Sequence, residues 1–297
     1  MKIAIIGAGV LGKALGILLK QADHEIVALS SRTVRSARVG AKAIGDVPVV
    51  GDPGLAALGA DVVILAVPDR VIPSVGIQVA TGGALRRGAV VAHLSGALPA
   101  GVLVGVRAAG GFPGSMHPLQ SFATLPTAVR SLPGSFVFLE GAPEAVEVLR
   151  SLVASIDARA VPLATASKSL YHAAACTASN YLVTLIDCAA QLMAMAGVPQ
   201  EVALPALLPL INGTIRNLES VGIPDALTGP IARGDAGTVR GHLQALRSGP
   251  PALRRLYVEL GLRTLDVARR KGRIEKAAAE QILGLLEEAD DGGRGKG

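Results

Sequence analysis

Five short apolar runs mark the first half of the chain. They lie at residues 2–6, 25–30, 62–67, 89–94 and 135–139, with helix-like or loop segments between them. Near-continuous apolar strands are typical of a parallel sheet that is covered on both faces. Strands that alternate with helices predict an α/β fold built on a doubly wound parallel sheet.

The pattern changes after about residue 160. Apolar positions at helical spacing predict long helices at 165–196, 200–221, 236–247, 251–271 and 273–288. Glycine and proline residues punctuate these segments. We therefore expect an α/β domain over residues 1–160, a smaller all-α domain over residues 161–290, and a disordered tail at residues 291–297.

Composition narrows the classes of partner. Aromatic residues make up 2% of the chain and tryptophan is absent, which disfavours nucleic-acid binding by base stacking. The net charge is +6, but the basic residues are scattered, and we interpret them as a solvated surface. We expect no nucleic-acid partner.

One long apolar segment and the two cysteines bear on the cellular compartment of the protein. Residues 169–186 carry no acidic or basic side chain other than His172, but several hydroxyl and amide groups make the segment a poor membrane span. We interpret it as a helix buried inside a soluble protein. Cys176 and Cys188 lie too far apart along one helix for a disulfide. No signal peptide is evident at the N-terminus, so we expect a cytoplasmic protein without membrane association.

A glycine-rich turn follows the first predicted strand. The sequence Gly7-Ala8-Gly9-Val10-Leu11-Gly12 fits the pattern G-x-G-x-x-G between a strand and a helix. Such glycines allow a tight turn, close approach of a pyrophosphate, and packing of helix on strand. The start of the helix supplies free N–H groups and a partial positive charge. We predict that Gly7, Gly9, Val10, Leu11 and Gly12 bind a dinucleotide; the alternative is a purely structural turn.

The second strand indicates which dinucleotide. An acidic residue about twenty positions after the glycines is typical of NAD sites, because it binds the ribose hydroxyls. Here Arg32 stands at that place, flanked by Ser31 and Thr33. A guanidinium can bind the 2′-phosphate of NADP through paired hydrogen bonds. We predict NADP(H) as the cofactor, held by these three residues; the alternative is a surface arginine.

Two later strands end in residues suited to the same site. Val67 and Pro68 follow one predicted strand, and Ser95 follows the next. Ligands of open α/β sheets bind at the carboxyl ends of strands. We therefore add these three residues to the cofactor site, although Ser95 also fits a plain turn. The polar loop 115–122 supplies His117 and Gln120 as candidate substrate contacts, unless it only caps the sheet.

A polar stripe runs along the helix predicted from residue 165. Lys168 and His172 lie about 40° apart on the helical wheel, and Asn180 continues a drifting row. Burial lowers the pKa of a lysine or histidine toward the range useful for proton transfer. We predict an acid/base site of Lys168, His172 and Asn180, and no metal site. The alternative is a lysine that reaches solvent and a histidine that is hydrogen-bonded in the core.

The stretch Leu227–Asp235 links two predicted helices. Its Thr228 is a candidate substrate contact, which would reach a site across a subunit interface. The alternative is a turn in which Asp235 caps the following helix.

These motifs together resemble those of a known group of proteins. The stretches GAGVLG, SSRT, AVPD, HPLQSF, YHAAACTASNY and LTGPIARGD resemble Rossmann-like proteins with a DUF2520 domain. That group is similar to pyrroline-5-carboxylate reductases, ketopantoate reductases and 6-phosphogluconate-type dehydrogenases. β-Hydroxyacid dehydrogenases place a catalytic lysine four residues before an asparagine. Here His172 occupies that fourth position, so the resemblance leaves Lys168 and His172 both open as the proton donor.

The resemblance implies a function and an assembly. We expect an NADPH-dependent oxidoreductase that transfers hydride to a small carbonyl compound, such as the 2-oxo acid ketopantoate, or to an imine. We also expect a homodimer. The alternatives are a non-catalytic NADP(H)-binding sensor and an F420-dependent NADP reductase.

Overall fold

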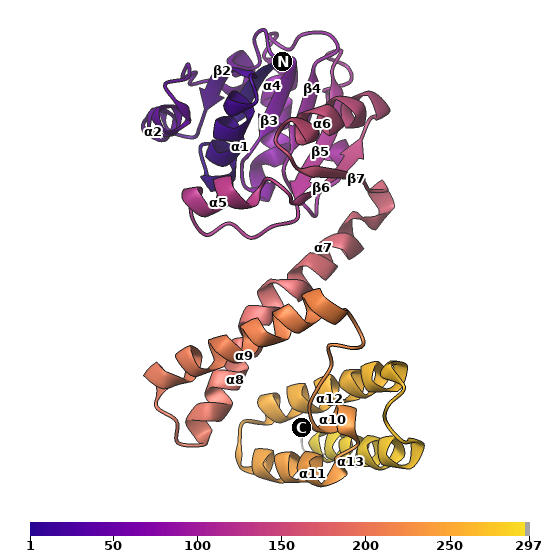
Figure 1. Cartoon of the computed structure of the whole chain (residues 1–297). Coiled ribbons are helices and arrows are strands. Elements are labelled where there is room, and N and C mark those ends of the chain that lie inside the picture. Colours follow the sequence, from indigo (N-terminus) through magenta and orange to yellow (C-terminus); the bar gives the residue numbers. More distant parts are fainter. Residues whose placement is uncertain (295–297) are drawn as a thin grey trace. The chain divides into compact units, whose positions relative to one another are not determined.

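The computed structural model describes residues 1–294 and divides into two compact units, Met1–Asn180 and the part from Tyr181 onward. The first unit contains a seven-stranded sheet of order β2-β1-β3-β4-β5-β6-β7 (Figure 1). Its strands are β1 (Lys2–Ile6), β2 (Glu25–Ser30), β3 (Val62–Leu65), β4 (Val90–His93), β5 (Phe112–Pro118), β6 (Phe136–Gly141) and β7 (Arg159–Pro162). Neighbouring strands are parallel except for β5 and β6. The predicted doubly wound fold is confirmed.

Helices cover both faces of this sheet. One face packs against α1 (Val10–Gln21), α2 (Val34–Ile44), α5 (Leu125–Ser131) and α6 (Pro143–Ser155). The other packs against α3 (Pro53–Ala56), α4 (Ile72–Thr81) and the short helix η2 (Ala100–Val102). All four residues of β3 have no exposed surface, which explains why that strand is apolar without alternation.

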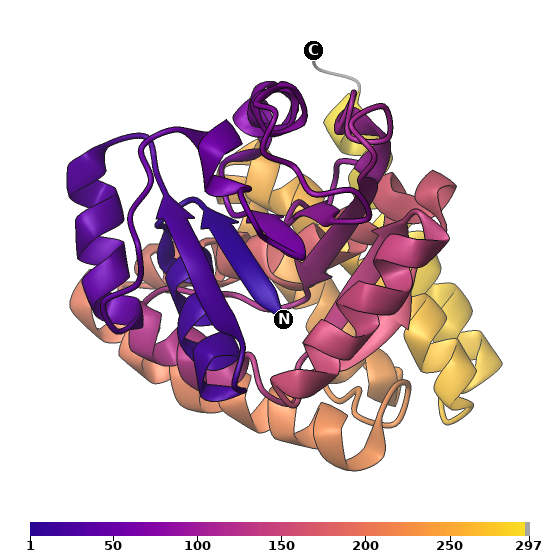
Figure 2. The same ribbon diagram turned by 90° about the horizontal axis from the view of Figure 1, so that it is seen from above.

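The parallel strands bring their carboxyl ends to one edge. Strand β1 lies between β2 and β3, and β4 and β5 follow in the same direction. Residues that follow β1, β3 and β4 therefore meet at this edge, beside the carboxyl half of β5. Figure 2 shows the same ribbon turned by 90° and seen from above, the side on which the N-terminus lies.

Strand β5 corrects one sequence prediction. Residues 115–118 were expected to begin a polar loop over 115–122, because polar side chains are dense there beside Pro118. They belong instead to the strand Phe112–Pro118, between β4 and β6. Tertiary pairing on both sides overrides the local preference of these residues. Ser115 and His117 alternate with the buried Met116, so they share one face of the strand.

The long helix predicted at 165–196 is interrupted. It consists of η3 (Thr165–Ser167), α7 (Lys168–Ala178) and α8 (Asn180–Met195), with an irregular backbone at Ser179. The prediction that this segment is buried in the protein is wrong. Over Thr165–Met195, none of its most apolar window is buried, although by length and composition that span is able to cross a membrane.

The second unit is helical. It contains α9 (Gln200–Val221), α10 (Pro230–Arg233), α11 (Ala236–Ala245), η4 (Leu246–Ser248), α12 (Pro251–Lys271) and α13 (Lys276–Arg294). Its core lies among α10 to α13, where Val239, Ile282 and Leu286 have no exposed surface. Helix α13 continues into the stretch predicted as tail, and residues 295–297 lie outside the described residues.

Helices α8 and α9 contribute little to that core. Ala203 is the one residue of theirs, in the described chain, that is buried. Large apolar side chains on both helices are exposed, among them Val183 and Leu210, each at 68%. Large exposed apolar side chains that gather in one patch mark an interaction site more often than a free surface.

Candidate functional site

Two glycines of the G-x-G-x-x-G turn are required by close packing. Gly7 has φ +120°, and a Cβ there would lie 2.1 Å from the carbonyl oxygen of Ala66. A Cβ on Gly12 would lie 2.1 Å from the carbonyl oxygen of Gly7. The turn thus brings the ends of β1 and β3 and the first turn of α1 into direct contact.

Gly9 has a different environment. It has an ordinary φ of −70°, and no protein atom lies within 4 Å of the place of a Cβ. Gly9 is the N-cap of α1, without a capping side chain, and no acidic residue stands in the first turn. Free N–H groups at Val10 and Leu11 therefore face open space at a helix N-terminus, which suits a pyrophosphate.

The end of β2 offers cations beside this helix start. Arg32 is exposed and forms no ion pair with a described residue. Thr33 caps α2 by accepting a hydrogen bond from the Ser36 N–H at 3.1 Å. Arg35 follows in the first turn of α2. This part of the edge is thus basic, with Thr33 occupied in holding the helix start.

A buried group at the same strand end has no partner. The hydroxyl of Ser30 is buried, and no described group bonds to it. The next residue, Ser31, is half-buried. Burying a hydroxyl without a hydrogen-bond partner destabilises a folded protein. A polar ligand bound at this strand end would supply the missing partner.

The ends of β3 and β4 are joined by Ser95. Its hydroxyl donates to the Asp69 carboxylate at 2.7 Å and accepts from the Leu98 N–H at 3.0 Å. Val67 and Pro68, which precede Asp69, lie half-buried and exposed. Ser95 is 5% exposed. Its hydrogen bonds hold this loop in place.

His93 anchors the same loop from below. Its Nδ1 accepts from the Ser95 N–H and its Nε2 donates to the Pro99 carbonyl, each at 3.2 Å. Burial lowers the pKa of His93 to about 4, an effect that the Pro99 hydrogen bond opposes. The ring is therefore neutral at neutral pH, and both of its nitrogens are used.

Lys168 enters this network from the first turn of α7. It is 3% exposed, and its ammonium donates to the Ser95 carbonyl at 3.1 Å and to the Ser115 hydroxyl at 2.5 Å. Burial lowers the pKa of Lys168, while the carboxylates of Glu140 and Asp69 act to raise it. The lysine is a buried charge that ties α7 to β4 and β5.

Glu140 on β6 supplies a buried negative charge. It is 4% exposed, and its carboxylate accepts from the Ala100 N–H and the Thr165 hydroxyl, both at 2.7 Å. Thr165 begins η3, directly before the helix that carries Lys168. Glu140 therefore fixes the entry into that helix as well as influencing the charge of its lysine.

Two aromatic rings lie further along α7 and β5. Nδ1 of His117 lies 2.6 Å from the Tyr171 hydroxyl. Burial lowers the pKa of His117 to about 4, helped by the charges of His172 and Lys168, and burial raises the pKa of Tyr171 to about 12. Both groups are thus neutral at neutral pH and share one hydrogen bond.

Gly96 fits closely between two histidines. A Cβ there would lie 2.7 Å from Nδ1 of His172 and 2.8 Å from Nε2 of His117. Nδ1 of His172 is buried without a described partner, while its Nε2 lies 3.7 Å from the Cys176 thiol. A glycine is needed at position 96 because the two rings occupy the space of a side chain.

The structure therefore brings four of the predicted polar residues, Ser95, His117, Lys168 and His172, into one group with four others. We call it the Lys168 cluster: Asp69, Ser95, Ser115, His117, Glu140, Lys168, Tyr171 and His172. It lies in the first unit, at the carboxyl edge of β3, β4 and β5.

Other predicted site residues lie elsewhere. Gln120 is exposed, and its side chain accepts from the adjacent Ser121 N–H. Asn180 is exposed at the start of α8, two turns beyond His172. Thr228 belongs to the second unit. The roles predicted for these three residues stay predictions.

Sequence reasoning missed four members of the cluster. Asp69 follows a predicted strand, so a rule that pairs polar residues at strand ends would have found it. Tyr171 lies on helix α7 beside His172, where no such rule applies. Ser115 was hidden by the mistaken loop. Glu140 gave no signal, because its partners lie 40 and 25 residues away in sequence.

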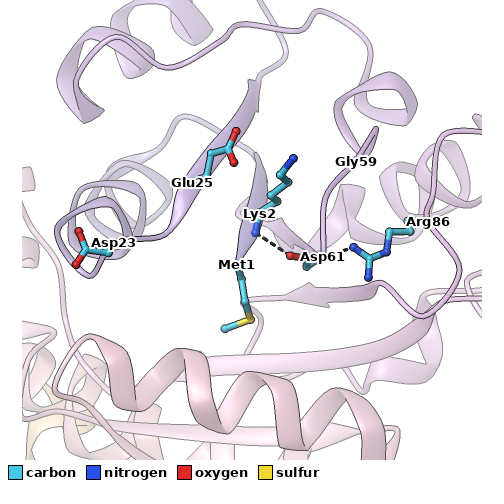
Figure 3. A pocket seen from close by; sticks show the side chains of 7 residues that line it. All are labelled: Met1, Lys2, Asp23, Glu25, Gly59, Asp61 and Arg86. Carbon is cyan, nitrogen blue, oxygen red and sulfur yellow. Dashed lines mark hydrogen bonds and ion pairs between the residues drawn. The ribbon is translucent and has the colours of Figure 1, made fainter.

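A pocket of about 480 Å³ opens at the amino edge of the same sheet (Figure 3). The N–H of Lys2 donates to the Asp61 carboxylate, which also pairs with Arg86. Ligands of open α/β sheets bind at the opposite edge. These residues thus serve to fix the start of β1.

Comparison with protein families divides the sequence in two. Residues 1–118 match the model of a Rossmann-like domain, and residues 135–264 match that of DUF2520, a domain of unknown function. No curated protein matches the sequence.

Solved structures with the same fold cover nearly the whole chain. A candidate NADP oxidoreductase of Bacteroides fragilis is 26% identical, with a TM-score of 0.70 over 89% of this chain and 97% of its own. A protein of Thermotoga maritima is 23% identical, with a TM-score of 0.64 over 99% and 100%. A reductive aminase of Aspergillus terreus, in complex with NADPH and ethyl-5-oxohexanoate, is 16% identical, with a TM-score of 0.58 over 99% and 95%. The last two likenesses establish the fold alone.

Proposed function

We propose that this chain, a Rossmann-like protein with a DUF2520 domain, is an NADPH-dependent reductase of a small carbonyl or imine compound. One observation carries the proposal. Along a single edge of the sheet, the uncapped helix start at Gly9 stands beside the Lys168 cluster. The names of the Bacteroides and Aspergillus proteins support the same cofactor and reaction type.

The residues that would hold the cofactor are those at the edge of β1 and β2. The N–H groups of Val10 and Leu11 would bind the pyrophosphate over the open space at Gly9. Arg32 would bind the 2′-phosphate, with the neighbouring Arg35 adding charge. When bound, NADPH would supply the hydride.

The Lys168 cluster would supply the proton. Reduction of a carbonyl adds hydride to carbon, moves the π electrons to oxygen, and requires one proton at that oxygen. Lys168 already bonds to Ser95 and Ser115 and is buried, which suits a fixed positive charge that stabilises the developing anion. We assign the proton donor to His172, which is half-buried beside Gly96.

The test follows the absorbance of NADPH with a panel of 2-oxo acids, ketopantoate included, and cyclic imines. Substrate-dependent loss of absorbance is the expected result. His172→Gln should lower kcat at least a hundredfold, as loss of a general acid does. Lys42→Ala, at an exposed site on α2, serves as the control and should leave kcat unchanged.

Three outcomes would contradict parts of this proposal. Tight NADPH binding without turnover of any substrate would favour a sensor. Hydride transfer to F420 alone would replace the substrate by a deazaflavin. An unchanged kcat in His172→Gln would remove that residue from the mechanism.

We also propose a cytoplasmic homodimer. The exposed apolar side chains of α8 and α9 would pack against a second copy. A membrane is the less suitable partner, because Lys168 is bound to the sheet and the 16 residues of α8 are fewer than a bilayer requires. Sedimentation at dilute concentration tests the assembly, and a monomer without detergent would contradict it.

A further inference from the structure

In the stretch Leu227–Asp235, two side chains make no polar contact with a described residue that would stabilise the fold. Gly229 has φ +97°, Gly234 ends α10 in the left-handed conformation, and Asp235 caps α11 by accepting from the Thr238 N–H at 2.9 Å. These residues are explained by the backbone. The side chains of Thr228 and Arg233 are exposed, and neither side chain makes a hydrogen bond or ion pair with a described residue.

These two side chains line one pocket. The pocket has a volume of about 420 Å³ and lies wholly within the second unit. It is lined by Leu227, Thr228, Gly229, Ala232, Arg233, Lys271 and Arg273. Three of these carry a positive charge, and none carries a carboxylate.

One of the three cations is held in place. The ammonium of Lys271 donates to the carbonyls of Asp225 and Leu227, each at 2.8 Å. These neutral acceptors fix its position without cancelling its charge, and they leave a third N–H free. The lysine thereby presents a fixed positive charge at the base of the loop.

Helix ends alone do not explain this charge. Lys271 ends α12 and Arg273 follows it, where cations commonly complement the helix dipole. Arg233 comes from α10, however, almost forty residues earlier in the chain. The nearby carboxylate of Asp235 is already occupied, because it accepts hydrogen bonds from the N–H and the hydroxyl of Thr238, at 2.9 and 2.6 Å.

We propose that this pocket binds a small oxyanion, the carboxylate or phosphate group of a metabolite. The guanidinium groups of Arg233 and Arg273 would accept it through paired, charge-assisted hydrogen bonds. Lys271 would add its free N–H, and the hydroxyl of Thr228 would donate as well. The proposal concerns the second unit alone and stands independently of the reductase activity.

The test is calorimetric titration of the full-length protein with inorganic phosphate and, separately, with pyruvate, at constant ionic strength. At least one of the two should bind saturably, and which one binds identifies the class of oxyanion. Arg233→Gln and Arg273→Gln should each weaken binding about tenfold or more, as expected for a charged hydrogen bond. Thr228→Val should weaken it less, without a change of charge.

Arg240→Gln is the matched control, because Arg240 is exposed on α11 and lies outside the pocket. It removes the same charge and should leave the affinity unchanged. The proposal is overturned by the absence of saturable binding of both anions, or by equal weakening in Arg240→Gln and Arg233→Gln. Thermal unfolding confirms that each variant is folded.

A parallel titration with NADPH separates the two proposals. NADPH binding without phosphate or pyruvate binding would overturn the anion pocket alone. Anion binding without NADPH binding would overturn the reductase alone.

Discussion

The glycine turn and the Lys168 cluster lie at the same edge of one sheet, yet they are built in opposite ways. At the turn, the protein leaves N–H groups and space unoccupied around Gly9. In the cluster, Ser95, Lys168 and Glu140 each make two or more hydrogen bonds with other parts of the protein. The turn is ready for a ligand, whereas most of the cluster is already satisfied.

In the proposed reductase, this difference would separate cofactor binding at the turn from proton transfer at the cluster. An empty helix start gains most of its stabilisation when a ligand arrives. A buried, bonded network instead holds charge in a fixed position before any ligand is present. Variants of the turn should therefore separate folding from binding, and variants of the cluster should change its charge balance.

The largest expected effect is that of Gly7→Ala. A Cβ would overlap the Ala66 carbonyl at 2.1 Å, and φ +120° is unfavourable for alanine. We expect a loss of several kcal/mol in the free energy of unfolding, on the order of a severe steric defect. Urea denaturation measures it, and a variant as stable as the wild type would show that β1 and β3 separate easily.

Gly9→Ala, two residues later, should behave in the opposite way. Its φ is ordinary and its surroundings are open, so the unfolding free energy should change by less than about 1 kcal/mol. The added methyl group would occupy the space proposed for the pyrophosphate. NADPH affinity should fall at least tenfold, measured by fluorescence titration. Unchanged affinity would place the cofactor elsewhere.

The same contrast explains what the sequence predicted. The glycine turn between a strand and a helix follows from residues close together in the chain, so local rules were sufficient to predict it. The cluster joins residues 69, 95, 115, 140 and 168, which only tertiary folding brings together. The helical wheel placed Lys168 and His172 on one stripe, but it did not reveal Glu140 or Tyr171. It also extended the stripe to Asn180, across the irregular backbone at Ser179.

Acid should destabilise the folded protein through His93. Because burial lowers its folded-state pKa to about 4 from 6.5, the unfolded state binds more protons between these values, and stability falls as the pH falls. The loss for this residue between pH 7 and pH 5 should be about 2 kcal/mol.

His93→Asn isolates this contribution from those of His117 and His24. The variant should be less stable at pH 7, since it loses the hydrogen bond to Pro99. Its further loss on acidification to pH 5 should be smaller than that of the wild type. Equal losses in the two proteins would mean that the pKa of His93 in the folded state is not below its unfolded value.

The smallest effect is expected for Glu140→Gln. The amide can still accept from the Ala100 N–H and can donate to the Thr165 oxygen, so both contacts persist while the negative charge is lost. Glu140 raises the pKa of Lys168, which burial lowers. Without that charge, the pKa of Lys168 should fall further, and the protein should lose about 1 kcal/mol at neutral pH.

The pH dependence of stability distinguishes the loss of the Glu140 charge from a loss of packing. A lysine with a lowered folded-state pKa costs stability at low pH, and this cost disappears as the pH rises from the folded pKa toward the unfolded value of 10.5. In Glu140→Gln this recovery should begin at a lower pH than in the wild type, so the two unfolding curves converge in alkaline solution. A pH-independent difference would mean that Glu140 acts only by holding Thr165 and Ala100 in place. Convergence would show that the charge of Glu140 on β6 raises the pKa of Lys168 on α7.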